Sequence, residues 1–330
     1  MEARRRGYRQ RTAAPPGPGY PLTNLTQLMS QLASEPAPAS ASASGLRHLP
    51  RRYLALGLII VAIVLLGALV VVRDNSGPGS TSTVETFNPA SSSLVSSLAS
   101  VPSSVYDTVG VTSPTIPVTP LVAAGHNAPV WLASVNGGHL PVVFFYGAEF
   151  APYAAAERWP LILALSRFGT FHQLGLMQSS STTAFANVST FTFWKASYVS
   201  HHVDLQSVER YSALNPTGAR YLGLQTPDAR QSAAIASYGT SATTFPLLDV
   251  ANRYVLDGSG FSPAVLTGVS QDQIAGFLSS PAAPLTQAVI AAANEITAAI
   301  CSVDGNKPDA VCESRGVLAA DEALKITPAH

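Results

Sequence analysis

Charged side chains are scarce in this chain of 330 residues. Asp, Glu, Lys and Arg make up 12% of it, which is about half of their usual share in a soluble protein. The 19 basic and 19 acidic residues cancel, so no net field favours nucleic acid or an acidic partner. We therefore predict no nucleic-acid partner. The missing charge is replaced partly by one long apolar run and partly by Ala, Ser, Thr, Pro and Gly.

Cysteine and the common catalytic motifs are also scarce. The two cysteines, Cys301 and Cys312, are too few for a zinc site built from cysteine. The chain has no Gly-rich phosphate loop and no serine nucleophile elbow. The cluster of His201, His202 and Asp204 is a poor chelate, because adjacent residues on a strand point to opposite faces. We therefore predict neither a metal nor a cofactor.

Residues 53–72 form an apolar run, YLALGLIIVAIVLLGALVVV, that contains no charged residue. Twenty helical residues extend about 30 Å, the thickness of a bilayer core. The run lies too far from the N-terminus for a signal peptide and lacks a small-residue cleavage site. It predicts a single transmembrane helix that holds the chain in membrane lipid.

Basic residues set the predicted orientation of this helix. Eight arginines precede it, and only Arg73 follows it closely. Because basic residues near a span stay in the cytoplasm, we place the N-terminus inside and residues 73–330 outside the cell membrane. Residues 1–52 are rich in Arg, Pro, Ala and Ser, a composition typical of a disordered basic tail.

Outside the membrane, the sequence divides into a linker, one domain and a tail. Residues 73–88 are rich in Gly, Ser and Thr and predict a flexible linker. We assign residues 89–320 to a single extracytoplasmic domain and residues 321–330 to a C-terminal tail.

Strand and helix patterns alternate along this domain. Short helices interrupted at Pro102 come first, followed by an extended, proline-rich stretch. Apolar runs predict strands at 130–135, 141–146, 172–178, 190–198 and, as two strands that meet at a turn, 246–256. Apolar spacing predicts helices at 153–168 and within 270–301, and a polar stretch at 205–240 has helical character. This order predicts an α/β architecture.

One segment carries a family resemblance. GAEFAPYAAAERWPLILALSRFGTF (147–171) resembles the active-site turn and first helix of a thioredoxin-like family known as domain of unknown function 929. Members of that family carry Cys-Pro-Tyr-Cys where this chain has Ala151-Pro152-Tyr153-Ala154. Further matches follow in the same order: LGLMQSSST (174–182), FTFWKASYVS (191–200), FPLLDVANRYV (245–255) and NEITAAIC (294–301).

The resemblance implies a thioredoxin-like fold with a helical insertion. In such a site the N-terminus of a helix stabilises a thiolate and lowers its pKa. Alanine offers no nucleophile, ligand or redox group, so we expect no catalytic residue and regard residues 151–154 as a vestigial motif. Two origins of the alanines stay open, a natural redox-inactive paralogue and an engineered double substitution.

The resemblance also implies a peptide-binding surface. Phe245-Pro246 corresponds to the loop where thioredoxin-like folds place a cis-proline facing the active-site turn. The backbone before that proline pairs with an extended peptide in the family fold. The implied peptide-binding residues are Tyr153, Trp159, Phe245 and Pro246. The alternative is a proline that only shapes the start of a strand.

The remaining polar candidates have structural and chemical readings. Cys301 and Cys312 close a short loop, for which a structural disulfide is expected, with a redox-active pair as the alternative. Glu157 and Arg158 are expected to form a buried polar pair. Glu149 is a candidate acid–base residue without an evident partner base.

These observations lead to one functional hypothesis and two alternatives. The hypothesis is a membrane-anchored, redox-inactive thioredoxin-like module that binds an extended peptide or an envelope protein outside the cytoplasm. The first alternative is a thiol–disulfide oxidoreductase, which requires either engineered alanines or a redox-active pair at Cys301 and Cys312. The second is a purely structural envelope protein.

Overall fold

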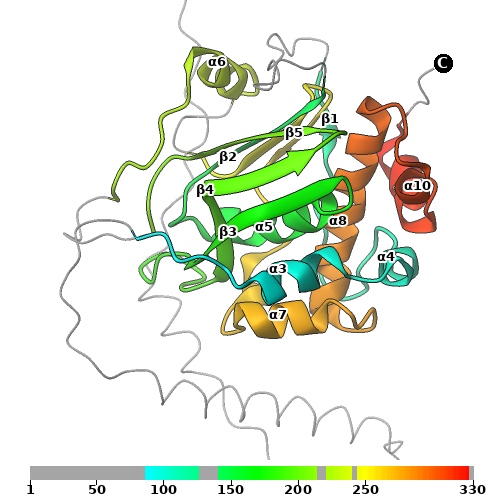
Figure 1. Cartoon of the computed structure of the whole chain (residues 1–330), viewed down its shortest axis with the longest axis horizontal. Coiled ribbons are helices and arrows are strands. Elements are labelled where there is room, and N and C mark those ends of the chain that lie inside the picture. Colours follow the sequence, from blue (N-terminus) through cyan, green and yellow to red (C-terminus); the bar gives the residue numbers. More distant parts are fainter. Residues whose placement is uncertain (1–85, 126–139, 214–220, 240–243, 327–330) are drawn as a thin grey trace, which may run out of the picture. The chain divides into compact units, whose positions relative to one another are not determined.

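The computed structural model describes residues 86–125, 140–213, 221–239 and 244–326. These residues form a mixed α/β arrangement of two β-sheets and surrounding helices (Figure 1). Four of the predicted segments lie outside the described residues entirely or nearly so: the tail at 1–52, the transmembrane helix at 53–72, nearly all of the linker and the strand at 130–135.

A five-stranded sheet lies at the centre. Its strands have the order β1–β7–β6–β2–β5, with the bounds β1 Val122–Ala123, β2 Val142–Gly147, β5 Asp204–Glu209, β6 Leu247–Val250 and β7 Tyr254–Asp257. β2 pairs parallel to β5 and antiparallel to β6, and β7 is antiparallel to both of its neighbours. β2, β6 and β7 confirm the strands predicted at 141–146 and within 246–256.

Helices cover both faces of this sheet. Their bounds are α3 Ser92–Ala99, α4 Ser103–Val109, α5 Pro152–Leu165, α6 Ala229–Ser237, α7 Gln271–Phe277, α8 Pro284–Val303, α9 Asp309–Cys312 and α10 Arg315–Leu324, with a 3-10 turn at Pro263–Leu266. The predicted short helices around Pro102, the helix after β2 and the helices within 270–301 are confirmed.

β2 shows why both faces need a cover. Its side chains alternate between two cores, as strand geometry requires: Val143 and Phe145 belong to the larger core, and Phe144 and Tyr146 to the smaller one. Helices α5 and α8 fill the larger core, and Ile235 of α6 joins the smaller one. The strand is therefore apolar throughout, because neither face meets water.

A separate hairpin packs on the other side of α5. β3 (Gly169–Gln178) and β4 (Ser189–Ser200) are antiparallel and confirm the strands predicted at 172–178 and 190–198. Trp159 of α5 contacts Phe191 of β4, with ring centroids 4.9 Å apart, and its indole Nε1 donates to the Ser189 carbonyl at 3.0 Å. The hairpin thus helps to enclose α5.

The helical character predicted for residues 205–240 is wrong for the first part of that stretch. Residues 204–209 form β5, in which Asp204 and Gln206 are buried. The polar sequence of β5 does not predict a strand. Pairing with β2 holds these residues in the sheet. The predicted helix begins only at Ala229, where Asp228 and Gln231 form a capping box.

Helix α8 is apolar on nearly all sides. Among the described residues it is the one helix long and apolar enough to cross a membrane by length and composition, but 83% of its apolar segment is buried within the domain. Such burial is typical of the core helix of a folded domain.

The predicted pairing of Glu157 with Arg158 is wrong, although both side chains are fully buried. Arg158 instead forms a bidentate ion pair with Glu209 of β5, at 2.9 and 2.6 Å. The Glu209 carboxylate also accepts a hydrogen bond from the Phe193 backbone N–H at 3.2 Å. Adjacent residues on a helix point in different directions, so Glu157 and Arg158 meet different neighbours.

Glu157 lies beside Glu295 of α8, and each carboxylate holds a strand-like segment against the helices. Glu157 Oε2 accepts from the Gly260 N–H at 2.7 Å, and Glu295 Oε2 accepts from the Leu121 N–H at 3.1 Å. Burial raises the pKa of Glu157 to about 8; the Gly260 hydrogen bond lowers it, and Glu295 raises it further. Burial likewise raises the pKa of Glu295 to about 7.

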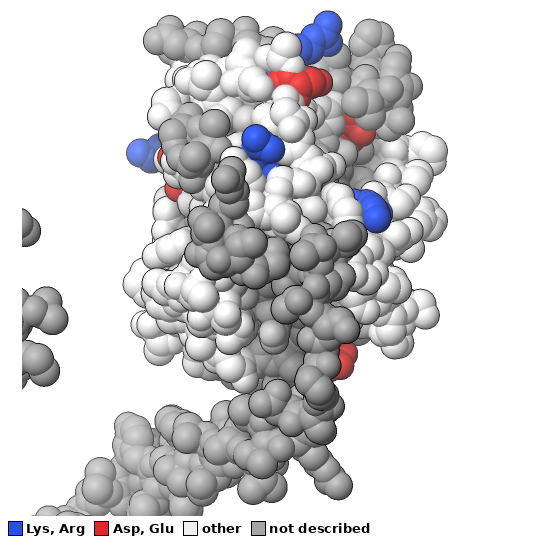
Figure 2. Space-filling view, turned by 90° about the vertical axis from the view of Figure 1, so that its left-hand side faces the viewer, with Lys and Arg blue, Asp and Glu red and all other residues white. Residues whose placement is uncertain are grey.

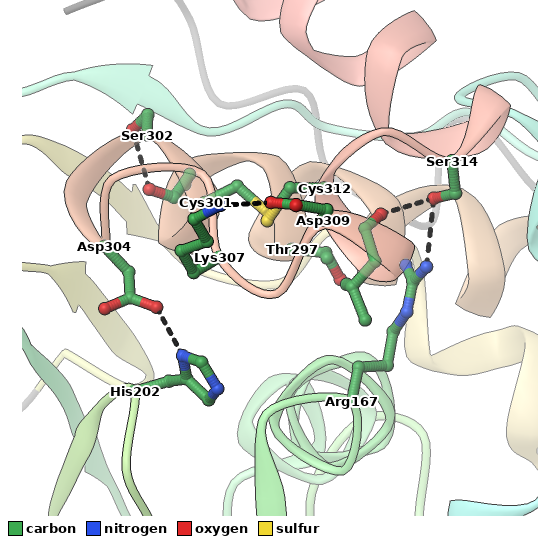
Figure 3. Close-up of a disulfide and its surroundings, with 12 residues drawn as sticks. Arg167, His202, Thr297, Cys301, Ser302, Asp304, Lys307, Asp309, Cys312 and Ser314 are labelled. Carbon is green, nitrogen blue, oxygen red and sulfur yellow. Dashed lines mark hydrogen bonds and ion pairs between the residues drawn. A yellow bond between two sulfur atoms is a disulfide. The ribbon is translucent and has the colours of Figure 1, made fainter.

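The predicted disulfide between Cys301 and Cys312 is confirmed (Figure 3). It joins the end of α8 to α9, with the two Cα atoms 5.7 Å apart, and both sulfur-bearing residues are buried. Nearby, Arg167 donates to Ser314 Oγ at 3.1 Å and lies over the Tyr106 ring at 4.4 Å. The C-terminal helices are therefore fixed to the core by one covalent link and several polar contacts.

Replacing both cysteines by alanine should lower the free energy of unfolding by about 3 kcal/mol, because the short closed loop no longer limits the unfolded chain. Urea denaturation of the full chain in detergent measures this loss. The native protein treated with a reductant should lose a similar amount, whereas the double variant should not respond to reductant. Equal stability of the oxidised native protein and the variant would contradict the structural role.

The Glu157–Glu295 pair should make stability depend on pH. Both pKa values in the folded protein lie above the usual 4.5, so the folded state binds more protons and the free energy of unfolding falls as pH rises from about 4.5 to about 8. Glu157→Gln keeps an acceptor for Gly260 and should flatten this slope by up to about 1.4 kcal/mol per pH unit.

Urea titrations at several pH values between 5 and 8 test this expectation. Asp272→Asn, which removes an exposed carboxyl group of α7, is the matched control and should keep the native slope. An unchanged slope in Glu157→Gln would show that the pair does not control the pH dependence.

Candidate functional site

The turn at residues 148–151 connects β2 to α5 and places the alanine motif at a helix N-terminus. Ala151 is the N-cap residue of α5, and its side chain makes no capping hydrogen bond. Pro152 occupies the first helical position, where its missing N–H costs nothing. The Ala151 N–H donates to the Ala148 carbonyl at 3.1 Å, which closes the turn. The first turn of α5 therefore presents its N-terminal, electropositive end here.

The motif residues differ sharply in exposure. Ala154 is fully buried and Ala151 is 6% exposed, whereas Tyr153 is 45% exposed. Tyr153 also meets Phe185 edge to face, with ring centroids 6.1 Å apart. Of the four motif side chains, Tyr153 is thus the one that presents a large apolar surface to solvent.

Five aromatic side chains surround the turn. This aromatic cluster consists of Tyr146, Phe150, Tyr211, Tyr221 and Phe245. Phe150, directly before the motif, stacks on Tyr221 at 4.1 Å and meets Phe245 edge to face at 5.8 Å. Phe245 also contacts Tyr146 at 5.2 Å and Tyr211 at 6.1 Å. Burial raises the pKa of the Tyr146 hydroxyl above its usual value.

The Phe245–Pro246 segment reaches the motif through this cluster. The peptide bond between the two residues is cis, as the family resemblance implies. Pro246 is buried, Phe245 is half-buried, and Thr244 before them is exposed. The contact between Phe150 and Phe245 therefore brings the chain before β6 beside the start of α5.

The four predicted peptide-binding residues do not share one surface. Trp159 is fully buried between α5 and β4, so it supports the fold and cannot contact a ligand at the surface. Pro246 is also buried. Tyr153 and Phe245 are accessible and lie on either side of the turn.

Glu149 lies two residues before Ala151 but is held by hydrogen bonds. Its carboxylate accepts from Thr192 Oγ1 at 2.5 Å and from the Ala213 N–H at 3.3 Å, and the side chain is 1% exposed. These contacts fix the turn to β4 and to the chain after β5. The carboxylate of Glu149 therefore stabilises the conformation of the turn.

The histidine cluster does not assemble at the turn. His202 Nδ1 lies 2.7 Å from Asp304 Oδ2 at the end of α8, as Figure 3 shows, whereas Asp204 is buried in β5. Within the described ranges, no group of three or more His, Cys, Asp or Glu side chains could hold a metal ion.

The disulfide lies at the opposite end of α5 from the motif. Ala151 caps the N-terminus of this 14-residue helix, while Arg167, just after its C-terminus, bonds to Ser314 near Cys312. A helix of that length spans about 21 Å. Cys301 and Cys312 therefore cannot act on a ligand that sits at the turn.

Sequence reasoning missed Phe150, Tyr211 and Tyr221 as neighbours of the motif. Tyr221 lies 70 positions beyond Ala151 in the sequence. Its hydroxyl donates to Ser180 Oγ at 3.0 Å, and the backbone beside it pairs with residues 210–212. Only the position of Phe150, adjacent to the motif, could have indicated its place.

Comparison with known proteins gives one match. No curated protein and no solved structure matches the chain. The sequence model of the family described as a domain of unknown function, DUF929, matches residues 133–302, which are more than half of the chain. The matched region contains β2, the turn, α5, the three later strands β5, β6 and β7 of the central sheet, and nearly all of α8. The chain therefore belongs to the DUF929 family.

Proposed function

We propose that this protein is a redox-inactive, thioredoxin-like binding module, anchored in the cell membrane by residues 53–72 and facing outward. Its ligand is an extended peptide that lies beside the turn. The contact of Phe150 with Phe245 carries the proposal, since it joins the motif to the residues before Pro246, of which Thr244 is exposed and Phe245 half-buried.

The order of the elements supports a thioredoxin-like fold. β2 leads through α5 to the parallel strand β5, and the antiparallel pair β6–β7 then leads to α8. A β-α-β unit followed by a β-β-α unit on one sheet is the arrangement of that fold. Here the β3–β4 hairpin is inserted between α5 and β5, whereas the helical insertion expected at 205–240 corresponds to α6, between β5 and β6.

The side chains at positions 151 and 154 support the loss of thiol chemistry at the motif. In the Cys-Pro-Tyr-Cys pattern of the family, thiols stand at positions 151 and 154, at the electropositive end of the helix. This chain has two buried methyl groups there. What the turn keeps is shape and apolar surface, through Tyr153 and the aromatic cluster, and these features serve binding without a covalent step.

Tyr153→Ala should weaken binding of an unfolded polypeptide about tenfold, because exposed aromatic side chains at the centre of an interface carry much of its free energy. Carboxymethylated α-lactalbumin, which is permanently unfolded and has no free thiol, is a suitable probe. Its affinity for the full chain in detergent is measured by fluorescence anisotropy.

Leu318→Ala is the matched control for this measurement. Leu318 is 50% exposed on α10, away from the turn, so its removal should leave the affinity unchanged. No binding by the native chain, or an equal loss in both variants, would overturn the proposed peptide site.

The double variant Ala151→Cys/Ala154→Cys should acquire disulfide reductase activity that the native chain lacks. The helix N-terminus lowers the pKa of a thiol at position 151, and position 154 lies one turn further along the same helix. Reduction of insulin disulfides in the presence of a thiol donor measures the gain. Turnover by the native chain would favour the oxidoreductase, and an inactive variant that folds normally would contradict a thioredoxin-like site.

A further inference from the structure

The chain joins the described domain along the edge of the β3–β4 hairpin. The Leu176 N–H donates to the Asn88 carbonyl at 2.6 Å, and the Ala90 N–H donates to the Leu174 carbonyl at 2.8 Å. Pro89 forms an antiparallel bridge with Gly175 between these bonds. Residues 88–90, at the end of the predicted linker, are therefore held on this hairpin, at the cyan segment before α3 in Figure 1.

Three side chains gather at this junction, and we name them the Trp194 cluster: Phe87, Trp194 and Lys195. Phe87 lies so close to Gly175 that a Cβ atom there would stand 2.7 Å from its ring. Phe87 meets Trp194 edge to face at 6.3 Å, and Lys195 Nζ lies 4.0 Å from the Trp194 ring centroid. Lys195 is exposed, and the two aromatic rings are half-buried.

The described segments that carry the cluster hold no acidic residue, although Glu85 directly precedes them in the sequence. Strands β3 and β4 and residues 86–106, which include α3, contain Lys195 but neither Asp nor Glu. Figure 2 views the side of the molecule on which the cyan segment lies in Figure 1, and uncharged side chains cover most of the described surface there. Lys195 is thus the one Lys, Arg, Asp or Glu side chain on these described segments, and it supplies a positive charge beside the Trp194 ring.

We propose that the Trp194 cluster rests in the headgroup layer of the membrane that anchors the chain. This inference rests on the proposed membrane anchor. Trp with Lys is the pairing enriched at bilayer interfaces, since the aromatic ring suits the headgroup level and the amine reaches anionic phosphates. The cluster gives the outer domain a fixed side toward the bilayer.

The length of the linker limits how far the domain can lie from the membrane. Fourteen residues, 73–86, separate the predicted end of the anchor from Phe87, and fourteen residues span at most about 50 Å in any conformation. A domain of this size has a diameter near 45 Å by the usual scaling. The linker therefore keeps the hairpin junction within about 50 Å of the end of the anchor, which places the Trp194 cluster within reach of the lipid.

The test uses the full chain reconstituted into vesicles of phosphatidylcholine and phosphatidylglycerol that carry brominated acyl chains. Bromine quenches tryptophan fluorescence only at contact with the bilayer. Trp194→Phe should remove a quenched component from the native signal. Lys195→Glu, which keeps every tryptophan, should lower the quenching of that component about fivefold or more at low salt.

Arg230→Glu is the matched control, because Arg230 is exposed on α6 at the other face of the sheet. It should leave the quenching unchanged, and circular dichroism confirms that each variant is folded.

Alkaline carbonate extraction separates the two proposals. A chain that is extracted lacks the anchor. A chain that stays in the vesicles, with the same quenching in native protein, Trp194→Phe and Lys195→Glu, overturns the lipid contact alone.

Discussion

Burial of helix α5 is the constraint on which the rest of the domain depends. The helix lies between the central sheet, the β3–β4 hairpin and α8, and it carries two ionisable residues, Glu157 and Arg158, into the core. A buried polar or charged group needs a partner. Arg158 therefore fixes β5 through Glu209, and Glu157 fixes the segment at Gly260. These two contacts hold β5 and the segment at Gly260 against α5.

The same burial explains the position of the proposed binding surface. Since α5 cannot shift, its N-terminus and the turn before it have a fixed place relative to Phe245 and β6. Glu149 adds two hydrogen bonds to the turn. A peptide site of this kind is already ordered before its ligand arrives, which lowers the entropic cost of binding. The proposal of a binding module therefore needs no catalytic residue at the turn.

The described domain has two chemically distinct ends along α5. The motif and the aromatic cluster lie at the N-terminal end, and the disulfide and the His202–Asp304 pair lie toward the C-terminal helices. Their separation keeps the cysteines away from the turn, so the proposed binding of a peptide would fall to the aromatic side chains. The proposed contact of the Trp194 cluster with lipid would add an orientation to this arrangement, with the hairpin facing the membrane.

Apolar periodicity in the sequence predicted β2, the hairpin strands, α5, α7 and α8, because their own side chains record which faces are buried. It failed at β5, where pairing with β2 holds Asp204 and Gln206 in the sheet, and at Glu157 and Arg158, whose partners lie far along the chain. Sequence alone also determined the composition, the alanines of the motif and the single cysteine pair. Only the tertiary structure decided that Trp159 is core, that Tyr153 is exposed, and that Tyr221 stacks beside the turn, because long-range packing sets which side chains meet and sequence spacing carries no record of it.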